Sequence, residues 1–416
     1  MGARRIMVIT HAGGSPYHGP NMRWYYMGLA LMPLGVEVEI VSSSFFHKYL
    51  NPPNIRRRLE TERVDGLIYH WVKTQPYRSR GPAQVRNQLE FVYGCYRAAT
   101  ALKARRPDVV IASSPHPLVN FPAAAIARRA GASFMFEVRD LWPSILLELG
   151  RFSRYHPYIA LLSAAERYGA SRADRVISVK PGDSEYFARR YGVPPARFSY
   201  IPNGFLPHSA KSHAPPAVSL LRRQYRLLVG YVGALSIYYD LDQFLKLARQ
   251  FRNRSEVGFV LVGTGARERH LAEKAAELEN VHMVGPVPKA AVPACLDLFD
   301  VCYAGLADLA VHRYGISCNK IYEYMHAGKP IIGSYSTGHD PVSMARCGII
   351  AAPGDNKAMG DGLSMLLDDR ELREACGRRA REYFDAYHDF RVVAKDVVCN
   401  LLEDHADCRH MKRRGA

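Results

Sequence analysis

Lys320 and Glu323 are the residues whose types and spacing best suit chemistry, in the stretch NKIYEYMHAGKPIIG. The stretch predicts a short helix over residues 320–326, and side chains three positions apart in a helix share one face. That face would carry a cation and a carboxylate beside the free N–H groups of a helix start. Such a combination suits a ligand that has both a phosphate and hydroxyl groups.

The residues around this helix must position it. Ser317 and Asn319 are of the types that cap helix starts, and Gly328 is a typical helix end. An apolar strand is predicted directly afterwards over residues 330–332, and another ends at Ala304. The helix is therefore expected to follow one buried strand and precede another.

Strands and helices alternate along nearly the whole chain, in two series. At 416 residues the chain is long enough for two domains, and two domains imply a cleft. Repeated βα alternation argues for parallel, doubly wound sheets, so we predict an α/β fold with two Rossmann-like domains. The predicted parts are residues 1–205 for the first domain, 206–226 for a linker, 227–388 for the second domain, 389–405 for a C-terminal helix and 406–416 for a basic tail.

Polar turns follow several predicted strands of the first domain. They are Gly13-Gly14, the turn Ser113–Pro117 with His116 between two prolines, and Arg139-Asp140. The carboxyl ends of parallel strands meet at one edge of a sheet, where ligands bind in open α/β folds. Glu137, inside the strand before Arg139, is expected to be a buried, hydrogen-bonded acid.

Composition narrows the class of protein. Hydrophobic content of 48% and charged content of 23% are ordinary for a globular protein. No apolar run reaches the roughly 20 residues that span a bilayer, and the N-terminus lacks the pattern of a signal peptide, so a cytosolic location is predicted. The eight cysteines are scattered without C-x-x-C spacing, so neither a zinc site nor a disulfide scaffold is expected.

The charge is distributed unevenly. The net charge is +17, and residues 1–205 hold 28 Lys and Arg against 14 Asp and Glu, whereas residues 206–416 hold 28 against 25. A basic first domain could attract nucleic acid, an anionic membrane or a phosphorylated lipid. Since no nucleic-acid motif accompanies it, we expect a membrane surface or a lipid as the partner, and no nucleic acid.

Several short motifs together resemble a known family. They are the Gly-Gly-x-Pro turn at Gly13, the RDLWP turn at Arg139, Pro202-Asn203-Gly204, Tyr231-Val232-Gly233, Leu261-Val262-Gly263-Thr264-Gly265, Gly285-Pro286-Val287 and YEYMHAGKPII around Glu323. In this order they resemble the family-4 glycosyltransferases, retaining enzymes of the GT-B fold that use a nucleotide-sugar donor. The sequences RDLWP and YEYMHAGKPII are most similar to those of bacterial surface-polysaccharide enzymes of the L-fucosamine transferase type.

The resemblance implies a role for particular residues. It implies transfer of a sugar, from a UDP-sugar by our prediction, to a hydroxyl of a glycan or a lipid-diphosphate-linked acceptor, with no metal and no other cofactor. The resemblance also implies a last helix that returns to the first domain. The basic first domain, rather than the resemblance, predicts a peripheral location on the inner face of the cytoplasmic membrane. The predicted donor-binding residues are Gly13, Gly14, Gly233, Gly263, Gly265, Val287, Asn319, Lys320 and Glu323. The predicted catalytic residues are Asp140, Lys320 and Glu323, and the acceptor-side candidates are His116, Arg139 and Asp140.

The sequence departs from the family at two places. The usual partner glutamate, eight positions before Glu323, is replaced by Gly315. The usual Arg and Lys after the first strand of the second domain are absent from residues 234–240. A diphosphate still needs positive potential, so Lys320 is the predicted replacement, with Arg313 and His312 as lesser candidates.

Each assignment has an alternative. Lys320 could be a solvated surface lysine, His116 a structural turn residue, and Asp140 the partner of Arg139 in a structural ion pair beneath Trp142. The whole chain could instead be a nucleotide-sugar 2-epimerase of the same fold, or a non-catalytic scaffold of a polysaccharide-assembly complex.

Overall fold

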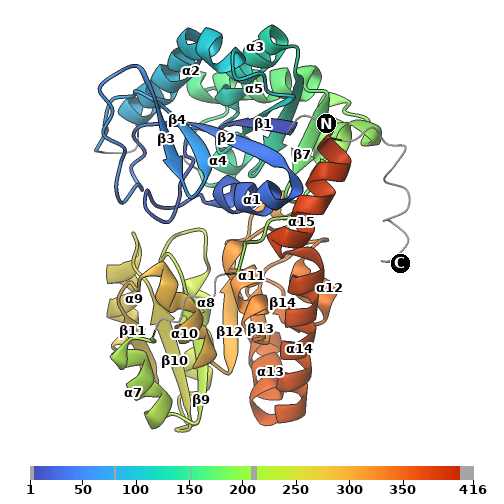
Figure 1. Ribbon diagram of the computed structural model, residues 1–416. Helices are drawn as coiled ribbons and strands as arrows, with labels where there is room; N and C mark the ends of the chain where they lie inside the picture. Colours follow the sequence, from blue (N-terminus) through green and yellow to red (C-terminus); the bar gives the residue numbers. More distant parts are fainter. Residues whose placement is uncertain (1–3, 79–80, 151, 208–212, 403–416) are drawn as a thin grey trace. The chain divides into compact units, whose positions relative to one another are not determined.

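The computed structural model describes residues 4–78, 81–150, 152–207 and 213–402 (Figure 1). The chain divides into two compact units, each with its own sheet. Unit 1 is Met1–Leu206 together with Asp389–Ala416, and unit 2 is Pro207–His388. The expected tail, residues 406–416, lies outside the described residues.

Unit 1 is built on an eight-stranded sheet with the order β3-β4-β2-β1-β5-β6-β7-β8. Its strands are β1 (Arg4–Ile9), β2 (Val36–Ser43), β3 (Leu59–Val64), β4 (Leu67–Val72), β5 (Val109–Ser113), β6 (Ser133–Val138), β7 (Arg175–Ser178) and β8 (Phe198–Tyr200). All neighbours pair in parallel except β3, which is antiparallel to β4. The strand order reverses direction at β1, which lies between β2 and β5.

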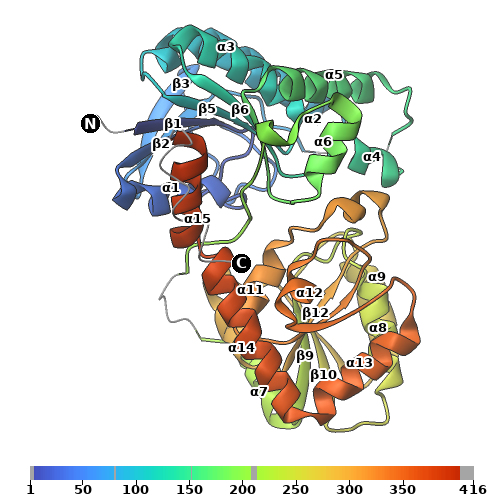
Figure 2. The same cartoon turned by 90° about the vertical axis from the view of Figure 1, so that its right-hand side faces the viewer.

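Helices cover both faces of this sheet. On one face lie α2 (Pro82–Lys103), α3 (Asn120–Ala130) and α5 (Pro157–Arg172); on the other, α1 (Arg23–Leu31) packs against α15 (Phe390–Val397), which continues as a π-helical turn, Val398–Leu402 (Figures 1 and 2). The remaining helices of the unit are α4 (Ser144–Glu148) and α6 (Asp183–Tyr191). Phe390, Val393 and Val397 of α15 are buried in the same core as α1 and the sheet, which ties the end of the chain to unit 1.

Unit 2 is built on a six-stranded, wholly parallel sheet with the order β11-β10-β9-β12-β13-β14. Its strands are β9 (Leu227–Val232), β10 (Val257–Val262), β11 (Val281–Val284), β12 (Val301–Gly305), β13 (Ile331–Ser334) and β14 (Gly348–Ala351). Every residue of β9 and β10 is buried, as expected for strands covered on both faces. Here the order reverses between β9 and β12.

The helices of unit 2 also form two layers. Helices α8 (Leu241–Gln250), α9 (Glu268–Ala275) and α13 (Asn356–Asp368) share one buried core with the sheet. Figure 2 shows α7 (Pro216–Gln224), α11 (Asn319–His326) and α14 (Arg370–Tyr387) on the opposite side. The remaining helices are α10 (Val292–Asp297) and α12 (Pro341–Ala345).

The predicted α/β class with two parallel, doubly wound sheets is confirmed, and three local predictions are corrected. Strand β3 was missed because its sequence, LETERV, is largely polar and lies at the sheet edge. Helix α7 occupies part of the expected linker, where Val218 and Leu221 are buried. Helix α11 starts at Asn319, and Ser317 does not cap it: the N-cap is Cys318, with no side-chain hydrogen bond.

Candidate functional site

The crevice expected for ligands in unit 2 lies where the strand order reverses, at the carboxyl ends of β9 and β12. Gly233 directly follows β9, and the loop after β12 leads through a 3₁₀ turn, Ala310–Tyr314, to helix α11. The loops after the two strands are joined where the Ala307 N–H donates to the Tyr238 carbonyl at 2.9 Å. The start of α11 is thereby held beside the turn after β9.

Lys320 is a buried cation at this crevice. Its side chain is only 7% exposed, and its Nζ donates to the Tyr231 hydroxyl at 3.0 Å. The same Nζ lies 2.8 Å from the ring centroid of Tyr239 and 4.6 Å from that of Tyr231. The alternative of a solvated surface lysine is therefore wrong.

Lys320 has no carboxylate partner within 4 Å in the part of the chain that the structure describes. Burial lowers the pKa of its amine from 10.5 to about 8. An ammonium group buried without a counter-ion is costly, and tyrosine rings compensate only part of that cost. A bound anion would supply the missing charge, so the arrangement fits the binding of a phosphate.

Glu323 lies one helical turn after Lys320. Its carboxylate pairs with Lys289 at 2.5 Å and is partly exposed. Lys289 follows the loop after β11 that contains Val287, so the ion pair holds Glu323 next to that loop. Glu323 and Lys320 are thus adjacent on α11, as their spacing predicted, but Lys289 was not anticipated.

Two glycine turns line the same crevice. Gly233 has a φ of +152° and Gly263 a φ of +145°, conformations that other residues rarely adopt. A Cβ on Gly263 would lie 1.9 Å from the Gly233 carbonyl oxygen, and a Cβ on Gly233 would lie 3.0 Å from Cε of Lys320. Likewise a Cβ on Gly265 would lie 2.3 Å from the carbonyl oxygen of Leu235. The turns after β9 and β10 can therefore stack only if these positions are glycine.

Other predicted residues of unit 2 lie around this crevice. Asn319 is the first residue of α11, and Gly315 has a φ of +112°. Arg313 lies in the turn before them, where its guanidinium stacks on the Tyr314 ring with 4.6 Å to the centroid. Tyr239, by contrast, comes from the segment that was singled out only for lacking a cation, and no signal in the sequence pairs it with Lys320.

The corresponding position in unit 1, where its strand order reverses, is at the carboxyl ends of β1 and β5. His11 follows β1 and His116 follows β5, and their ring centroids are 4.9 Å apart. His11 Nε2 lies 2.6 Å from Oδ1 of Asn87, on α2. Both histidines are fully buried.

His116 lacks any hydrogen-bond partner for either ring nitrogen among the described residues. Burial lowers its pKa far below the usual value and lowers the pKa of His11 to about 4, so both rings are neutral at pH 7. A neutral imidazole offers one donor and one acceptor. His11 and Asn87 were not predicted from the sequence, because only the fold brings them to His116.

Glu137 is confirmed as a buried, hydrogen-bonded acid. It accepts from Arg23 Nε at 2.9 Å, from Trp24 Nε1 at 2.7 Å and from Ser113 Oγ at 2.5 Å. Burial opposes ionisation, but the charge of Arg23 and these donors bring the pKa of Glu137 below its ordinary value. Since Arg23 also donates to the carbonyl of Pro202 at 2.8 Å, the cluster holds the Pro-Asn-Gly turn in place.

The RDLWP turn places Asp140 at the surface and leaves Arg139 half-buried. No Arg139–Asp140 ion pair occurs within 4 Å among the described residues, so the proposed structural pair is not formed. Burial lowers the pKa of Arg139, and the negative charge of Glu137 is the largest effect that raises it. Asp140 is thus an accessible carboxylate at the carboxyl end of β6.

Gly13 and Gly14 were predicted to bind the donor, and their amides have hydrogen-bond partners within unit 1. The Gly13 N–H donates to Ser42 Oγ at 2.8 Å, and the Gly14 N–H donates to the Asn21 carbonyl at 3.3 Å. A Cβ on Gly14 would lie 1.9 Å from the Pro20 carbonyl oxygen. These glycines therefore allow close packing of the loop after β1, and their N–H groups are already engaged.

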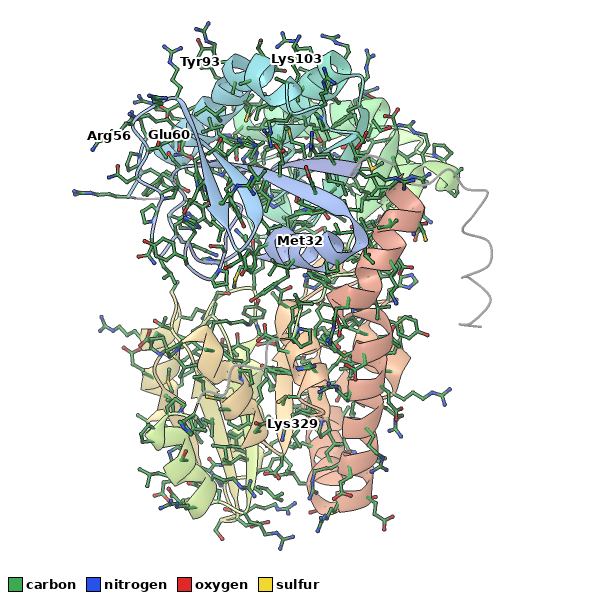
Figure 3. All side chains as sticks on the ribbon, in the orientation of Figure 1. Met32, Arg56, Glu60, Tyr93, Lys103 and Lys329 are labelled. Atoms are coloured by element: carbon green, nitrogen blue, oxygen red, sulfur yellow. The ribbon has the colours of Figure 1, made fainter. Side chains whose placement is uncertain are left out.

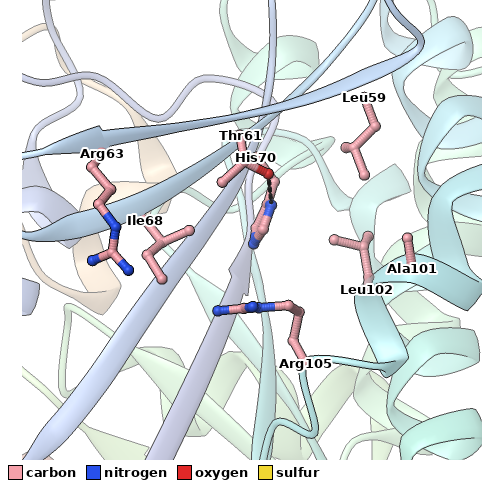
Figure 4. Close-up of a pocket in the computed structure, with 8 residues that line it drawn as sticks. All are labelled: Leu59, Thr61, Arg63, Ile68, His70, Ala101, Leu102 and Arg105. Atoms are coloured by element: carbon pink, nitrogen blue, oxygen red, sulfur yellow. Dashed lines mark hydrogen bonds between the residues drawn. The ribbon is translucent and has the colours of Figure 1, made fainter.

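One pocket of about 220 Å³ lies elsewhere in unit 1 (Figure 4). It is lined by Leu59, Thr61, Arg63, Ile68, His70, Ala101, Leu102 and Arg105. His70 bridges Thr61 Oγ1 at 3.0 Å and the buried Glu39 at 2.8 Å, and Arg105 also binds Glu39. These groups come from strands β3 and β4 and from the end of α2, away from the position where the strand order of this unit reverses. No group of metal-ligating side chains occurs among residues that the structure describes.

Two models of glycosyltransferase domains match the chain. The model described as "Glycosyl transferase 4-like domain" matches residues 18–204, and that described as "Glycosyl transferases group 1" matches residues 226–369. Together the matched ranges span about four fifths of the chain. The protein therefore belongs to the glycosyltransferases of the GT-B type with group 4-like and group 1 domains.

Solved structures show the same fold at low identity. WaaG, a glycosyltransferase involved in lipopolysaccharide biosynthesis, is 16% identical with a TM-score of 0.64, over 94% of this chain and 98% of that one. Anabaena HepE, solved in complex with UDP, is 15% identical with a TM-score of 0.67, over 95% and 99%. Apo OtsA is 12% identical with a TM-score of 0.70, over 96% and 99%. The predicted GT-B fold is confirmed, and no curated protein sequence matches.

Proposed function

We propose that the protein is a retaining, metal-independent glycosyltransferase that moves a sugar from a UDP-sugar to a hydroxyl of a glycan or lipid-diphosphate-linked acceptor in surface-polysaccharide synthesis. The observation that carries the proposal is Lys320, a buried ammonium without a carboxylate partner at the strand-order reversal of unit 2. The choice of uridine is supported by HepE, a protein of the same fold solved with UDP. The likeness of the RDLWP turn to L-fucosamine transferases makes an amino-deoxy sugar the first donor to test.

On the donor side, Lys320 neutralises the diphosphate as the sugar leaves. Glu323 accepts hydrogen bonds from the ribose hydroxyls, and its carboxylate, paired with Lys289, is partly exposed and can be reached by a ligand. Gly233, Gly263 and Gly265 let the turns approach the nucleotide closely, and Val287 and Asn319 complete the site. The amides of Gly13 and Gly14 are not given a role, because they have partners within unit 1.

The chemistry rests on electrostatic stabilisation of the leaving group. Departure of the nucleoside diphosphate concentrates negative charge on its phosphate oxygens, and a fixed cation in a poorly solvated crevice stabilises that charge more than water would. The acceptor hydroxyl attacks from the face that the diphosphate leaves, and a donor phosphate oxygen takes its proton. The configuration at the anomeric carbon is thereby retained.

On the acceptor side, the proposal assigns His116, Arg139 and Asp140. The neutral imidazole of His116 offers one unpartnered donor and one unpartnered acceptor, the combination that a sugar hydroxyl requires. Asp140 orients the transferred sugar or the acceptor, and its exposure leaves it free to do so. Removing His116 should therefore affect acceptor use rather than nucleotide binding.

We also propose a location on the inner face of the cytoplasmic membrane, where lipid-linked acceptors are found. No helix among the described residues is long and apolar enough to cross a bilayer. Attachment would have to come from the surface, and the excess of basic residues before residue 206 supports an anionic surface.

The test is a thermal-shift panel of UDP, GDP and their common sugars on the wild type, Lys320→Ala and Glu323→Ala. A ligand that binds only the folded state raises the melting temperature, so one nucleotide class should give a shift that both variants lose. Lys329→Ala is the matched control, since the ammonium group of this lysine donates to the Asp297 carbonyl at 3.0 Å and the variant should keep the shift. A rise in melting temperature that is retained in Lys320→Ala would refute the proposed donor site. No rise with any nucleotide would favour the alternative that the protein is a non-catalytic scaffold.

Analysis of the reaction products distinguishes a glycosyltransferase from the remaining alternative, a nucleotide-sugar 2-epimerase. A 2-epimerase would interconvert two sugar nucleotides without an acceptor, which NMR of the incubated donor detects. A transferase leaves the donor sugar unchanged until an acceptor is added and then releases UDP.

A further inference from the structure

The outer surface of the helix layer α2, α3 and α5 is strongly basic. The layer's cations are Arg86, Arg97, Lys103, Arg128, Arg129, Arg167 and Arg172, whereas its acids are only Glu90 and Glu166. Glu90 is paired with Arg86 at 2.8 Å. Glu166 is buried, and burial raises its pKa to about 7. The other six cations are exposed and have no carboxylate within 4 Å among the described residues.

An apolar stripe runs through the same surface. Leu89, Tyr93 and Tyr96 are spaced four and three residues apart on α2 and are 44%, 65% and 39% exposed. Residues with this spacing form one face of a helix, and here the face points away from the sheet. Figure 3 shows the side chains of Tyr93 and Lys103 projecting outward from α2. A soluble surface has no need to expose three large side chains in a row.

We infer that this surface, formed by the outer faces of α2, α3 and α5, docks the protein on an anionic phospholipid membrane. Tyrosine and leucine between arginines are suited to the interface, where the rings enter the headgroup region while the cations stay at the phosphates. Six uncompensated cations match a negatively charged leaflet, because each is attracted to the anionic headgroups near its surface. The inference rests on the proposed membrane location but not on the donor site.

The rim of the pocket extends this surface at the end of α2. Arg63 has no carboxylate within 4 Å among the described residues, and Arg105 is partly exposed above Glu39. Figure 4 shows both guanidinium groups on one side of the pocket and the apolar Leu59 and Leu102 on the other. A phosphate with an attached apolar group would meet complementary chemistry at both ends.

Nucleic acid is the competing partner for a basic surface. A phosphate backbone alone would not account for Leu89 and two tyrosines in a helical stripe without a flat platform of stacked rings. A lipid surface accounts for the cations and the stripe together. RNA binding is therefore treated as an outcome that would overturn the inference.

The experiment is co-sedimentation of the full-length protein with vesicles of phosphatidylcholine, with or without phosphatidylglycerol, at low and high salt. The face variant carries Arg97→Gln, Arg128→Gln, Arg129→Gln and Arg167→Gln. Binding should require phosphatidylglycerol, weaken at high salt and fall about five-fold for each charge removed, the factor that corresponds to about 1 kcal/mol. Tyr93→Ser with Tyr96→Ser should weaken binding while leaving every charge in place.

The matched control removes four exposed cations of unit 2, with Arg223→Gln, Arg226→Gln, Arg252→Gln and Arg378→Gln. It has the same net charge as the face variant and should bind vesicles like the wild type. Equal loss in both variants, unchanged binding of the face variant, or preference for RNA over vesicles would each overturn the inference. Vesicle binding needs no sugar nucleotide, and the UDP-induced thermal shift of the face variant should remain, so failure here is distinct from failure of the donor site.

Discussion

Replacing Lys320 with methionine should stabilise the ligand-free protein and abolish nucleotide binding. Methionine keeps much of the volume of lysine and removes the ammonium group. Lowering the pKa of a lysine from 10.5 to about 8 means that keeping it charged in the folded state costs about 3 kcal/mol at pH 7. This cost disappears in Lys320→Met.

The substitution also removes favourable contacts. The hydrogen bond to the Tyr231 hydroxyl contributes about 1 kcal/mol, and the attraction to the rings of Tyr231 and Tyr239 about another 1 kcal/mol. A net gain of about 1 kcal/mol remains. For a unit of this size it corresponds to a rise of about 2–4 °C in melting temperature.

The assay is calorimetric unfolding of wild type and variant at several pH values, with and without UDP. The unfolded lysine binds more protons than the folded one between pH 8 and 10.5, so wild-type stability gains from this group as pH rises through that window. The advantage of Lys320→Met should therefore be largest at pH 7 and shrink toward pH 10. Lys246→Met, on the exposed face of α8, is the control and should change stability by less than about 0.5 kcal/mol.

Two results would refute this reasoning. A variant destabilised by more than about 1 kcal/mol at pH 7 would mean that the tyrosine contacts outweigh the burial of the charge. A UDP-induced rise in melting temperature that survives the substitution would mean that the ammonium group does not bind the phosphate.

Three further predictions concern the two strand-order reversals and the cluster at Glu137. Burial lowers the pKa of His11 from 6.5 to about 4, so between these pH values the unfolded state binds more protons than the folded state. The free energy of unfolding should therefore fall as pH falls from 6.5 toward 4, and His11→Gln should flatten this pH dependence. An unchanged pH dependence of denaturation in the variant would contradict this. Glu137→Gln leaves Arg23 buried without its counter-charge and should cost about 3–5 kcal/mol in urea unfolding; a cost below about 1 kcal/mol would show that the charge is not needed. Gly263→Ala places a methyl group 1.9 Å from the Gly233 carbonyl oxygen, so calorimetric titration should find UDP binding weakened at least about tenfold. A variant that binds UDP with wild-type affinity would show that the two turns need not stack.

The amino-acid sequence by itself determined the alternation of elements and hence the fold class. The predicted strand at residues 330–332 and the strand predicted to end at Ala304 correspond to β13 and β12, and the predicted helix at residues 320–326 corresponds to α11. The edge strand β3 was beyond such reasoning, because an antiparallel strand with one solvated face has no continuous apolar run. Motif order pointed to Lys320 and Glu323, and helical spacing placed them on one face.

Only the tertiary structure decided what surrounds those residues. Tyr231 lies in β9, 89 positions before Lys320, and Tyr239 lies in the loop after β9, so no local pattern links them to Lys320. The same holds for His11 and Asn87 beside His116, and for the partners that occupy the amides of Gly13 and Gly14. Spacing within one element fixes which side chains share a face, whereas burial and charge compensation depend on contacts between elements far apart in the chain, and these set the pKa of Lys320.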